Sequence, residues 1–268
     1  MHATRILKIG INPEIAPFSF LNAAKQPTGY AVDVCHAVVR HIKKETKLAD
    51  LSVQYVMLTA EKRIPDLKSG AIDMECGAST NTKARQEEVG FSYTYFVAGL
   101  RALSTKNINI STLHQLNGLQ VAVIAGATSE KLLMQVNAGT GSIAIKPYSS
   151  SMTAFKALQD GHVQAMVDDD LLLLELVGQA KAADKFHLSP LVLSVEPYAV
   201  MLRKDDTAFQ HLIDRGLAEL FASDEIKKIY DTWFITETLN FPENRLTRES
   251  IVRPNKEPGV AMLLGYSL

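Results

Sequence analysis

The first part of the chain alternates between short apolar segments that predict strands and amphipathic segments that predict helices. Residues 6–11 and 51–58 are rich in β-branched residues and predict strands, while apolar residues recur at helical spacing over 34–44. A helix over 60–69 and a short strand over 71–76 complete a βαβαβ order. This order predicts a mainly parallel sheet with helices on its faces.

The pattern restarts after a polar stretch and an aromatic segment. A second βαβαβα unit is predicted, with strands over 119–124, 143–147 and 163–167 and helices over 128–136, 150–160 and 171–182. A strand over 198–203 and helices over 207–223 and 224–234 follow. Two segments are predicted to be irregular: the Pro-rich residues 13–20, as a loop with exposed aromatics, and the tail from residue 236.

These elements predict an α/β protein of two lobes, because the closing strand and helices need a place beside the first unit. The first lobe is expected to comprise residues 1–104 and 198–268, and the inserted lobe residues 105–197. Ligands of open α/β sheets bind beyond the carboxyl ends of the strands. We therefore expect the binding site in the cleft between the lobes.

Composition narrows the class of protein. The chain has 268 residues, of which 28 are Lys or Arg and 29 are Asp or Glu, for a net charge of −1. This balance gives no electrostatic reason to expect nucleic acid as a partner. The apolar stretches are too short for a membrane helix. Cys35 and Cys76 allow one disulfide or two buried thiols, and we favour the thiols because their spacing indicates nothing more specific.

Polar side chains follow four of the predicted strands: Asn12, Ala78–Thr80, Gly126–Ser129 and Asp168–Asp169. Arg85 adds a guanidinium group that can bind a carboxylate through two hydrogen bonds. Thr80 and Thr128 stand before helices, where backbone N–H groups favour an anion, and Asp169 contributes a negative charge. Together they indicate a receptor for a zwitterion.

Each of these residues also has a purely structural interpretation. Thr80, Thr82 and Thr128 can be helix N-caps, Arg85 can be a solvated surface residue, and the Asp168–Asp170 run can match the dipole of the next helix. Because these polar residues all follow predicted strands, at four separate strand ends, we favour their interpretation as a binding site over the structural one.

Several motifs resemble type II periplasmic amino-acid-binding proteins. They are Phe18 with Gly29-Tyr30-x-x-Asp33, the run from Arg85-Gln86 to Phe91-Ser92, and Gly126-x-Thr128-x-Glu130. Within that family the chain is most similar to the glutamate/aspartate-binding branch of ABC-importer receptors. The segments that resemble this branch are Arg63-Ile-Pro65, Glu75-Cys76-Gly77, Thr128-Ser129-Glu130 and Met201–Asp206.

The resemblance implies a role for each matching position. Arg85, Thr80 and Thr128 would hold the ligand α-carboxylate, and Asp169 would hold the α-ammonium with the backbone of Ala78. The ligand side chain would contact Arg63, Asn12, Ser151 and Phe18. Three positions depart from the branch: Asn12 replaces an arginine, Ala60 a serine and Ser151 a histidine. The zwitterion-binding set is thus complete, and the side-chain subsite is altered.

The resemblance implies a monomeric periplasmic receptor that closes on an amino acid and delivers it to the membrane permease of an ABC importer. No signal peptide is visible before the first strand, so a cytoplasmic location stays open. We expect no cofactor and no metal. An enzyme of the dehydratase type and a sensory domain are the alternatives. The seven histidines are scattered, none follows a predicted strand, and no catalytic motif is present, which favours a binding protein over an enzyme.

Overall fold

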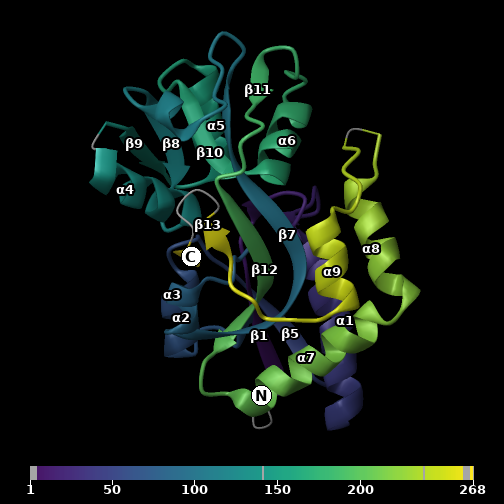
Figure 1. Cartoon of the computed structure of the whole chain (residues 1–268). Coiled ribbons are helices and arrows are strands. Elements are labelled where there is room, and N and C mark those ends of the chain that lie inside the picture. Colours follow the sequence, from purple (N-terminus) through teal and green to yellow (C-terminus); the bar gives the residue numbers. More distant parts are fainter. Residues whose placement is uncertain (1–4, 141, 238, 262–265, 268) are drawn as a thin grey trace. The chain divides into compact units, whose positions relative to one another are not determined.

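The computed structural model describes residues 5–140, 142–237, 239–261 and 266–267, and the chain forms two compact units (Figure 1). Unit 1 comprises Met1–Leu58, Lys62–Val97 and Pro197–Pro258. Unit 2 comprises Thr59–Glu61, Ala98–Glu196 and Gly259–Leu268. Two long neighbouring strands, β7 (Val89–Thr105) and β12 (Ser194–Arg203), contribute residues to both units.

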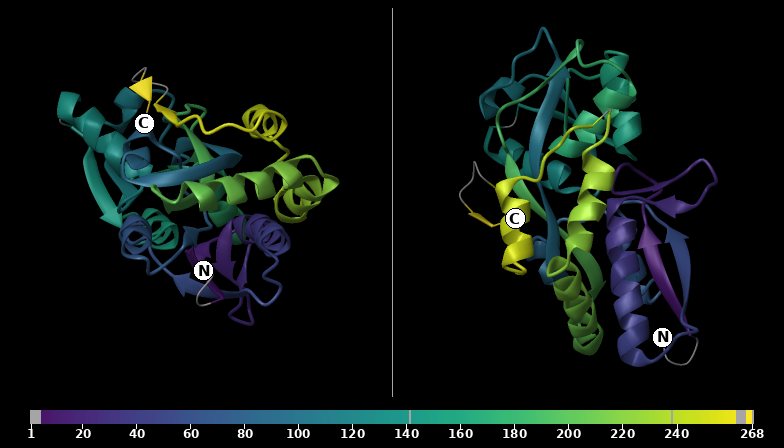
Figure 2. Two further views of the ribbon diagram at one scale, coloured as in Figure 1. Left: turned by 90° about the horizontal axis from the view of Figure 1, so that it is seen from below. Right: turned by 90° about the vertical axis from the view of Figure 1, so that its right-hand side faces the viewer.

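Unit 1 is built on the strand order β5-β1-β6-β12, in which β1 pairs in parallel with β5 and β6. The bounds of its strands are β1 Ile6–Ile11, β5 Ser52–Met57 and β6 Met74–Glu75, with a small separate sheet of β2 Glu14–Ile15, β3 Ser19–Leu21 and β4 Pro27–Thr28. Its helices are α1 Tyr30–Thr46, α2 Arg63–Ser69, α3 Lys83–Gln86, α7 Thr207–Phe221, α8 Asp224–Phe234 and α9 Arg245–Val252. Figure 2 shows α1 lying alongside this sheet.

Unit 2 has a parallel core of β10-β8-β9, with β7 antiparallel to β10. Its strands are β8 Gln120–Ile124, β9 Ala144–Tyr148, β10 Ala165–Asp169, β11 Phe186–Leu188, β13 Val260–Ala261 and β14 Tyr266–Ser267. Its helices are α4 Thr128–Thr140, α5 Ser151–Gln159 and α6 Asp170–Gln179, preceded by a 3₁₀ turn at Leu113–Leu116.

The alternation of β8 explains how both faces of the unit 2 sheet are buried. Val121 and Val123 belong to the hydrophobic cluster that includes α4, while Ala122 and Ile124 belong to the cluster of α5 and α6. Successive strand side chains point to opposite faces, so a continuous apolar run fits a strand covered on both sides.

The tail is more ordered than the sequence predicts. It contains α9, whose N-cap Asn244 accepts the N–H of Thr247 at 2.9 Å. The Asn244 amide also donates to the carbonyl of Val97 at 2.8 Å, and the Thr247 hydroxyl accepts the Val97 N–H at 3.0 Å. The prediction of an irregular tail is therefore wrong, because hydrogen bonds to a distant strand stabilise a short helix with little apolar periodicity.

Residues 13–20 also differ from the prediction of an exposed loop. Phe18 is 0% exposed and packs in an aromatic cluster with Tyr30, Phe96 and Tyr198. Its carbonyl accepts the N–H of Ala31 at 2.9 Å, so the turn before β3 is hydrogen-bonded to the start of α1. The small sheet folds this segment inward, which a Pro-rich sequence does not reveal.

Gly29 is required where this segment meets α1. Its φ is +128°, and a Cβ added there would lie 2.3 Å from the carbonyl oxygen of Phe18. This close approach explains why a glycine precedes Tyr30 at the start of α1.

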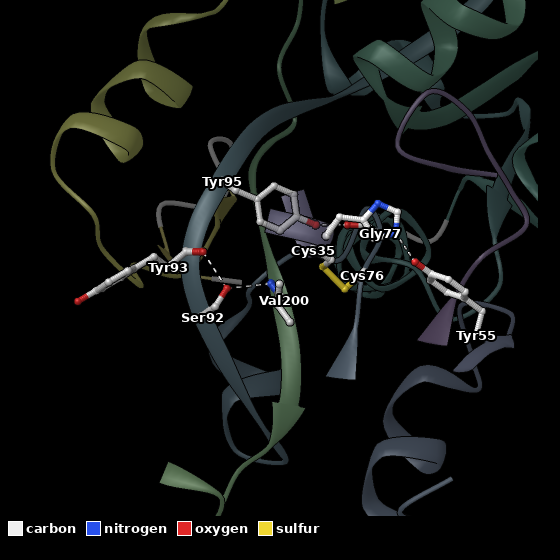
Figure 3. Close-up of a disulfide and its surroundings, with 9 residues drawn as sticks. Cys35, Tyr55, Cys76, Gly77, Ser92, Tyr93, Tyr95 and Val200 are labelled. Carbon is white, nitrogen blue, oxygen red and sulfur yellow. Dashed lines mark hydrogen bonds between the residues drawn. A yellow bond between two sulfur atoms is a disulfide. The ribbon is translucent and has the colours of Figure 1, made fainter. Parts of the chain in front are cut away.

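The two cysteines form a disulfide, so the preference for two buried thiols is wrong. Cys35 on α1 and Cys76 after β6 have Cα atoms 6.4 Å apart, and the bridge closes a 41-residue separation. In the chain-entropy account a loop of this size contributes roughly 3–5 kcal/mol to stability. Figure 3 shows the bridge near Gly77, whose carbonyl accepts the Tyr95 hydroxyl. Sequence spacing could not reveal the pairing because it does not report distance in the fold.

The helices of the described ranges include none with the length and apolar character needed to cross a membrane.

We expect Gly29→Ala to lower the free energy of unfolding by about 3 kcal/mol, because the new Cβ meets a carbonyl oxygen and the backbone conformation is strained. Gly70→Ala is the matched control: Gly70 also has a positive φ, but no atom lies within 4 Å of the added Cβ. That control should cost about 1 kcal/mol. Urea unfolding of both variants tests this, and equal losses would show that the contact with Phe18 is unimportant.

Candidate ligand-binding residues

In unit 1, residues 80–86 form a short turn that holds Arg85 in place. The hydroxyl of Thr82 accepts the N–H of Arg85 at 3.1 Å and caps α3. The Arg85 guanidinium donates to the carbonyl of Thr80 at 3.0 Å. Arg85 is only 5% exposed, so its interpretation as a solvated surface residue is wrong. For Thr82, the N-cap interpretation is confirmed.

Arg63 lies at the start of α2 and is likewise buried, at 6% exposure. Its guanidinium donates to the hydroxyl of Ser79 at 2.5 Å and to the carbonyl of Ala78 at 3.4 Å. Glu75 is 1% exposed, and burial raises the pKa of its carboxyl while the positive charge of Arg63 acts in the opposite direction. Arg63 and Glu75 therefore belong to one buried polar cluster.

Asn12 and Phe18 differ in their surroundings: Asn12 makes polar contacts, and Phe18 is packed among aromatic rings. The Asn12 side-chain oxygen accepts the N–H of Glu14 at 2.9 Å, which leaves its amide NH2 to offer to a ligand. The backbone carbonyl of Asn12 accepts the Ser19 hydroxyl at 2.7 Å. Phe18 points into the aromatic core described above, where it supports the residues around it.

In unit 2, Thr128 begins α4 and its hydroxyl donates to the carboxylate of Glu196 at 2.8 Å. Glu196 is 0% exposed and also accepts the Ser194 hydroxyl. The N–H of Gly126 donates to the Glu130 carboxylate at 2.8 Å. The Thr128 hydroxyl, which is expected to face an anion, and the Gly126 N–H are thus both directed at carboxylates of the protein itself.

Ser151, Asp168 and Asp169 form a second buried group in unit 2. The Ser151 hydroxyl donates to one oxygen of Asp168 at 2.6 Å, and the N–H of Asp169 donates to the other at 2.9 Å. Burial raises the pKa of the Asp168 carboxyl to about 6, and the charge of Glu196 adds to this effect while the Ser151 hydrogen bond opposes it. Asp169 is the buried N-cap residue of α6, and Asp170 supplies the acid of its first turn.

Within each unit, contacts join some of the predicted site residues to one another or to other buried polar groups. Unit 1 gathers Arg63 with Ala78, and Thr80 with Arg85. In unit 2, Thr128 and Ser151 are linked to the carboxylates of Glu196 and Asp168, respectively. We call Arg63, Ala78, Thr80 and Arg85 the cationic half-site. We call Thr128, Ser151, Asp168, Asp169 and Glu196 the acidic half-site.

Sequence reasoning missed two carboxylates, Glu75 and Glu196. Both lie in strands that are otherwise buried, and an acidic residue inside an apolar strand segment is the signal that could have found them. Among the described residues, no group of three or more His, Cys, Asp or Glu is placed to hold a metal ion.

Two named bacterial proteins are similar in sequence to this chain over most of its length. A protein of Pseudomonas aeruginosa named L-glutamate/L-aspartate-binding protein is 36% identical over 270 residues, covering 97% of this chain and 88% of that protein. The glutamate/aspartate import solute-binding protein of Escherichia coli K12 is 35% identical, covering 85% of this chain and 76% of that protein.

A solved structure, an ancestral arginine-binding protein bound to arginine, is similar to this chain with a TM-score of 0.77 and 28% identity. It covers 85% of this chain and 98% of its own length. The predicted fold class, a two-lobed type II periplasmic-binding-protein fold, is confirmed. The profile of the bacterial extracellular solute-binding proteins, family 3, matches residues 7–236, and the chain belongs to that family.

Proposed function

We propose that this protein is a periplasmic receptor that captures a polar amino acid and delivers it to the permease of an ABC importer. Glutamate and aspartate are the first ligands to expect, followed by their amides. The observation that carries the proposal is the 36% and 35% identity with two proteins named for glutamate and aspartate. The two half-sites supply the chemistry that a zwitterion requires, and we expect the receptor to act as a monomer.

The α-carboxylate of the ligand would bind to Arg85. Its guanidinium is buried and held by the Thr80 carbonyl, so little side-chain freedom is lost when a ligand binds. The hydroxyls of Thr80 and Thr128 would add hydrogen bonds to the same carboxylate. Thr128 would first exchange its bond to Glu196, which lowers the net gain from that contact.

The α-ammonium would bind to Asp169, with the carbonyl of Ala78 as a second acceptor. Asp169 stands among the buried acids of unit 2, and Glu196 and Asp168 lie in the same half-site. An acidic environment of this kind favours a cation over a neutral group. Because the expected contacts come from both units, ligand binding would favour a closed arrangement, which small-angle scattering would register as a smaller radius of gyration.

The ligand side chain would contact Arg63, Asn12 and Ser151. Arg63 brings a positive charge, but Glu75 shares its buried cluster and offsets part of that charge. Asn12 can offer its amide NH2, and the Ser151 hydroxyl already donates to Asp168. Such a subsite should hold a carboxylate less selectively than one lined by several cations, so acids and amides should differ little in affinity.

An oxidising compartment fits the disulfide between Cys35 and Cys76, since structural disulfides persist outside the cytoplasm. We infer that the protein is not an enzyme, because the relatives from Pseudomonas aeruginosa and Escherichia coli are named as binding proteins. Recovery of an unchanged amino acid after long incubation with the protein would support this inference, and a converted product would contradict it.

We expect Arg85→Ala to weaken binding of every amino acid ligand by about a hundredfold or more. Two charge-assisted hydrogen bonds are lost, each contributing roughly 1.5–3 kcal/mol. Isothermal titration calorimetry with glutamate and glutamine measures the loss. Arg248→Ala, which removes an exposed arginine paired with Glu243, is the control and should bind like the wild type. Affinity within a few-fold of wild type for Arg85→Ala would place the carboxylate contact elsewhere.

The ratio of the affinity for glutamate to that for glutamine should rise as the pH falls from 8 to 5. Loss of the Asp168 charge weakens the hold on the α-ammonium of both ligands equally, and it removes repulsion only from the glutamate side chain. Asp168, with a pKa of about 6, is ionised above this pH and neutral below it, whereas the glutamate side chain remains charged down to about pH 4.3. Relief of about 1 kcal/mol of repulsion corresponds to roughly fivefold. Calorimetry at several pH values tests this.

The matched variant for this pH profile is Asp168→Asn, which keeps the shape of the side chain and removes its titration. The ratio of its affinities for glutamate and glutamine should be the same at pH 5 and pH 8. An identical pH profile for glutamate and glutamine in the wild type would show that Asp168 does not face the ligand side chain.

A further inference from the structure

The segment of the chain after α9, residues 253–258, contacts the turn that carries Arg85. We call it the C-terminal strap. The backbone carbonyl of Lys256 accepts the amide of Asn81 at 3.0 Å and the amide of Gln86 at 3.2 Å. The Gln86 amide also donates to the side-chain oxygen of Asn81 at 2.9 Å. Two side chains of the 80–86 turn therefore meet at one carbonyl oxygen of a residue about 170 positions away.

Asn81 and Gln86 are the neighbours in sequence of the two residues proposed to bind the ligand carboxylate, Thr80 and Arg85. Asn81 is fully buried, and its N–H donates to the carbonyl of Pro197 at 2.7 Å. The bond between the Asn81 and Gln86 side chains spans the turn from one end to the other. The strap thus holds both ends of the 80–86 turn through side chains that do not themselves belong to the proposed ligand contacts.

The strap is in turn fixed to the body of unit 1 by the side chain of Lys256. Its ammonium forms an ion pair with Asp214 on α7 and lies 5.4 Å from the ring centroid of Tyr93. Asp214 is buried and also accepts the N–H of Tyr93 at 3.0 Å. The neighbouring carbonyl of Asn255 accepts the N–H of Thr94 at 3.0 Å.

These contacts make one connected path from α7 and β7 through the strap to the 80–86 turn. An ion pair whose acidic partner is buried and hydrogen-bonded is stronger than a pair exposed on both sides. Lys256 is one-third exposed, so its pair with Asp214 is partly screened by solvent. The backbone carbonyl of the same residue accepts both amides.

We infer that Lys256 is a positioning residue for amino acid binding: its ion pair with Asp214 holds the strap against Asn81 and Gln86 and so fixes the 80–86 turn. This inference rests on the proposed function of Arg85 and Thr80. A guanidinium must keep its orientation to bind a carboxylate through two hydrogen bonds, and a mobile turn would have to be ordered at the expense of binding free energy. The effect should therefore be the same for all ligands that share the α-carboxylate.

The alternative is that the strap only adds to the stability of unit 1. Lys256→Met removes the charge and keeps most of the side-chain volume, whereas Lys256→Arg keeps the charge beside Asp214. Arg253→Met is the matched control, because Arg253 is an exposed cation of the same strap. Calorimetry with glutamate and glutamine should show a loss of roughly tenfold for Lys256→Met with both ligands, which is about 1.4 kcal/mol. Lys256→Arg should recover most of the affinity, and Arg253→Met should lose none.

A double-mutant cycle with Gln86→Met separates the two interpretations. If the strap acts through the Gln86 amide, the Lys256→Met/Gln86→Met double variant should lose about as much affinity as either single variant, and not the product of the two losses. A lower melting temperature for Lys256→Met with affinity within twofold of wild type would overturn the inference and leave the strap a purely stabilising element. Losses that multiply would show that Lys256 does not act through Gln86.

Hydrogen exchange without ligand gives a readout that does not depend on the proposed function. The N–H groups of Arg85 and Gln86 are hydrogen-bonded to Thr82, so they report the order of the turn. Lys256→Met should speed their exchange about tenfold, and Arg253→Met should not. If the wild type bound no amino acid, the proposed function would fail, and this exchange would still decide whether Lys256 fixes the turn. Unchanged exchange in Lys256→Met would overturn the inference.

Discussion

A buried ionised side chain without partners costs several kcal/mol, and this constraint governs how both units of the protein are arranged. Unit 1 buries Arg63 and Arg85, and unit 2 buries Asp168, Asp169 and Glu196. Arg63 and Arg85 donate to hydroxyl and carbonyl oxygens at the end of β6 and in the turn that follows. Asp168 and Glu196 accept from hydroxyls at the starts of helices. The neutral dipoles that solvate these charges also fix their orientation.

Partial solvation of this kind suits a receptor. A guanidinium has five N–H donors and a carboxylate has about four lone-pair sites, so such groups can share their contacts with a ligand. We expect a zwitterion to bring a counter-charge to each kind of group. Burial also raises the pKa of Asp168, so its carboxyl is neutralised more easily than that of an exposed aspartate. We expect the ligand to contribute strongly to the stability of the folded protein for this reason.

The sequence predicts most strands and helices because their apolar periodicity is strong. The helix over 34–44 and the strands over 6–11 and 119–124 are confirmed with small shifts at their ends. The failures lie where distant contacts determine the structure. The short helix α9 depends on Val97, the burial of Phe18 depends on the close approach of Gly29, and the disulfide depends on where α1 meets the strand β6. The apolar periodicity of the sequence reports none of these contacts.

For the candidate site, residue type and strand position provide candidate residues, but not the partners that the structure gives them. Arg63 lies beside Ser79 and Glu75, and the hydroxyl of Thr128 is directed at Glu196. Glu196 lies two residues before the strand that the sequence predicts at 198–203, so its burial in β12 was missed. The contact of Lys256 with the 80–86 turn spans about 170 residues and has no signal in the sequence.

The central claim is that the two half-sites bind a polar amino acid as a zwitterion. Mass spectrometry of the small molecule that the protein retains through gentle purification tests it most directly, because tight receptors keep a bound ligand. The account predicts glutamate, aspartate, glutamine or asparagine, in amounts that fall sharply in Arg85→Ala. A retained aromatic or aliphatic amino acid, a compound without an α-carboxylate, or equal retention by Arg85→Ala would contradict it.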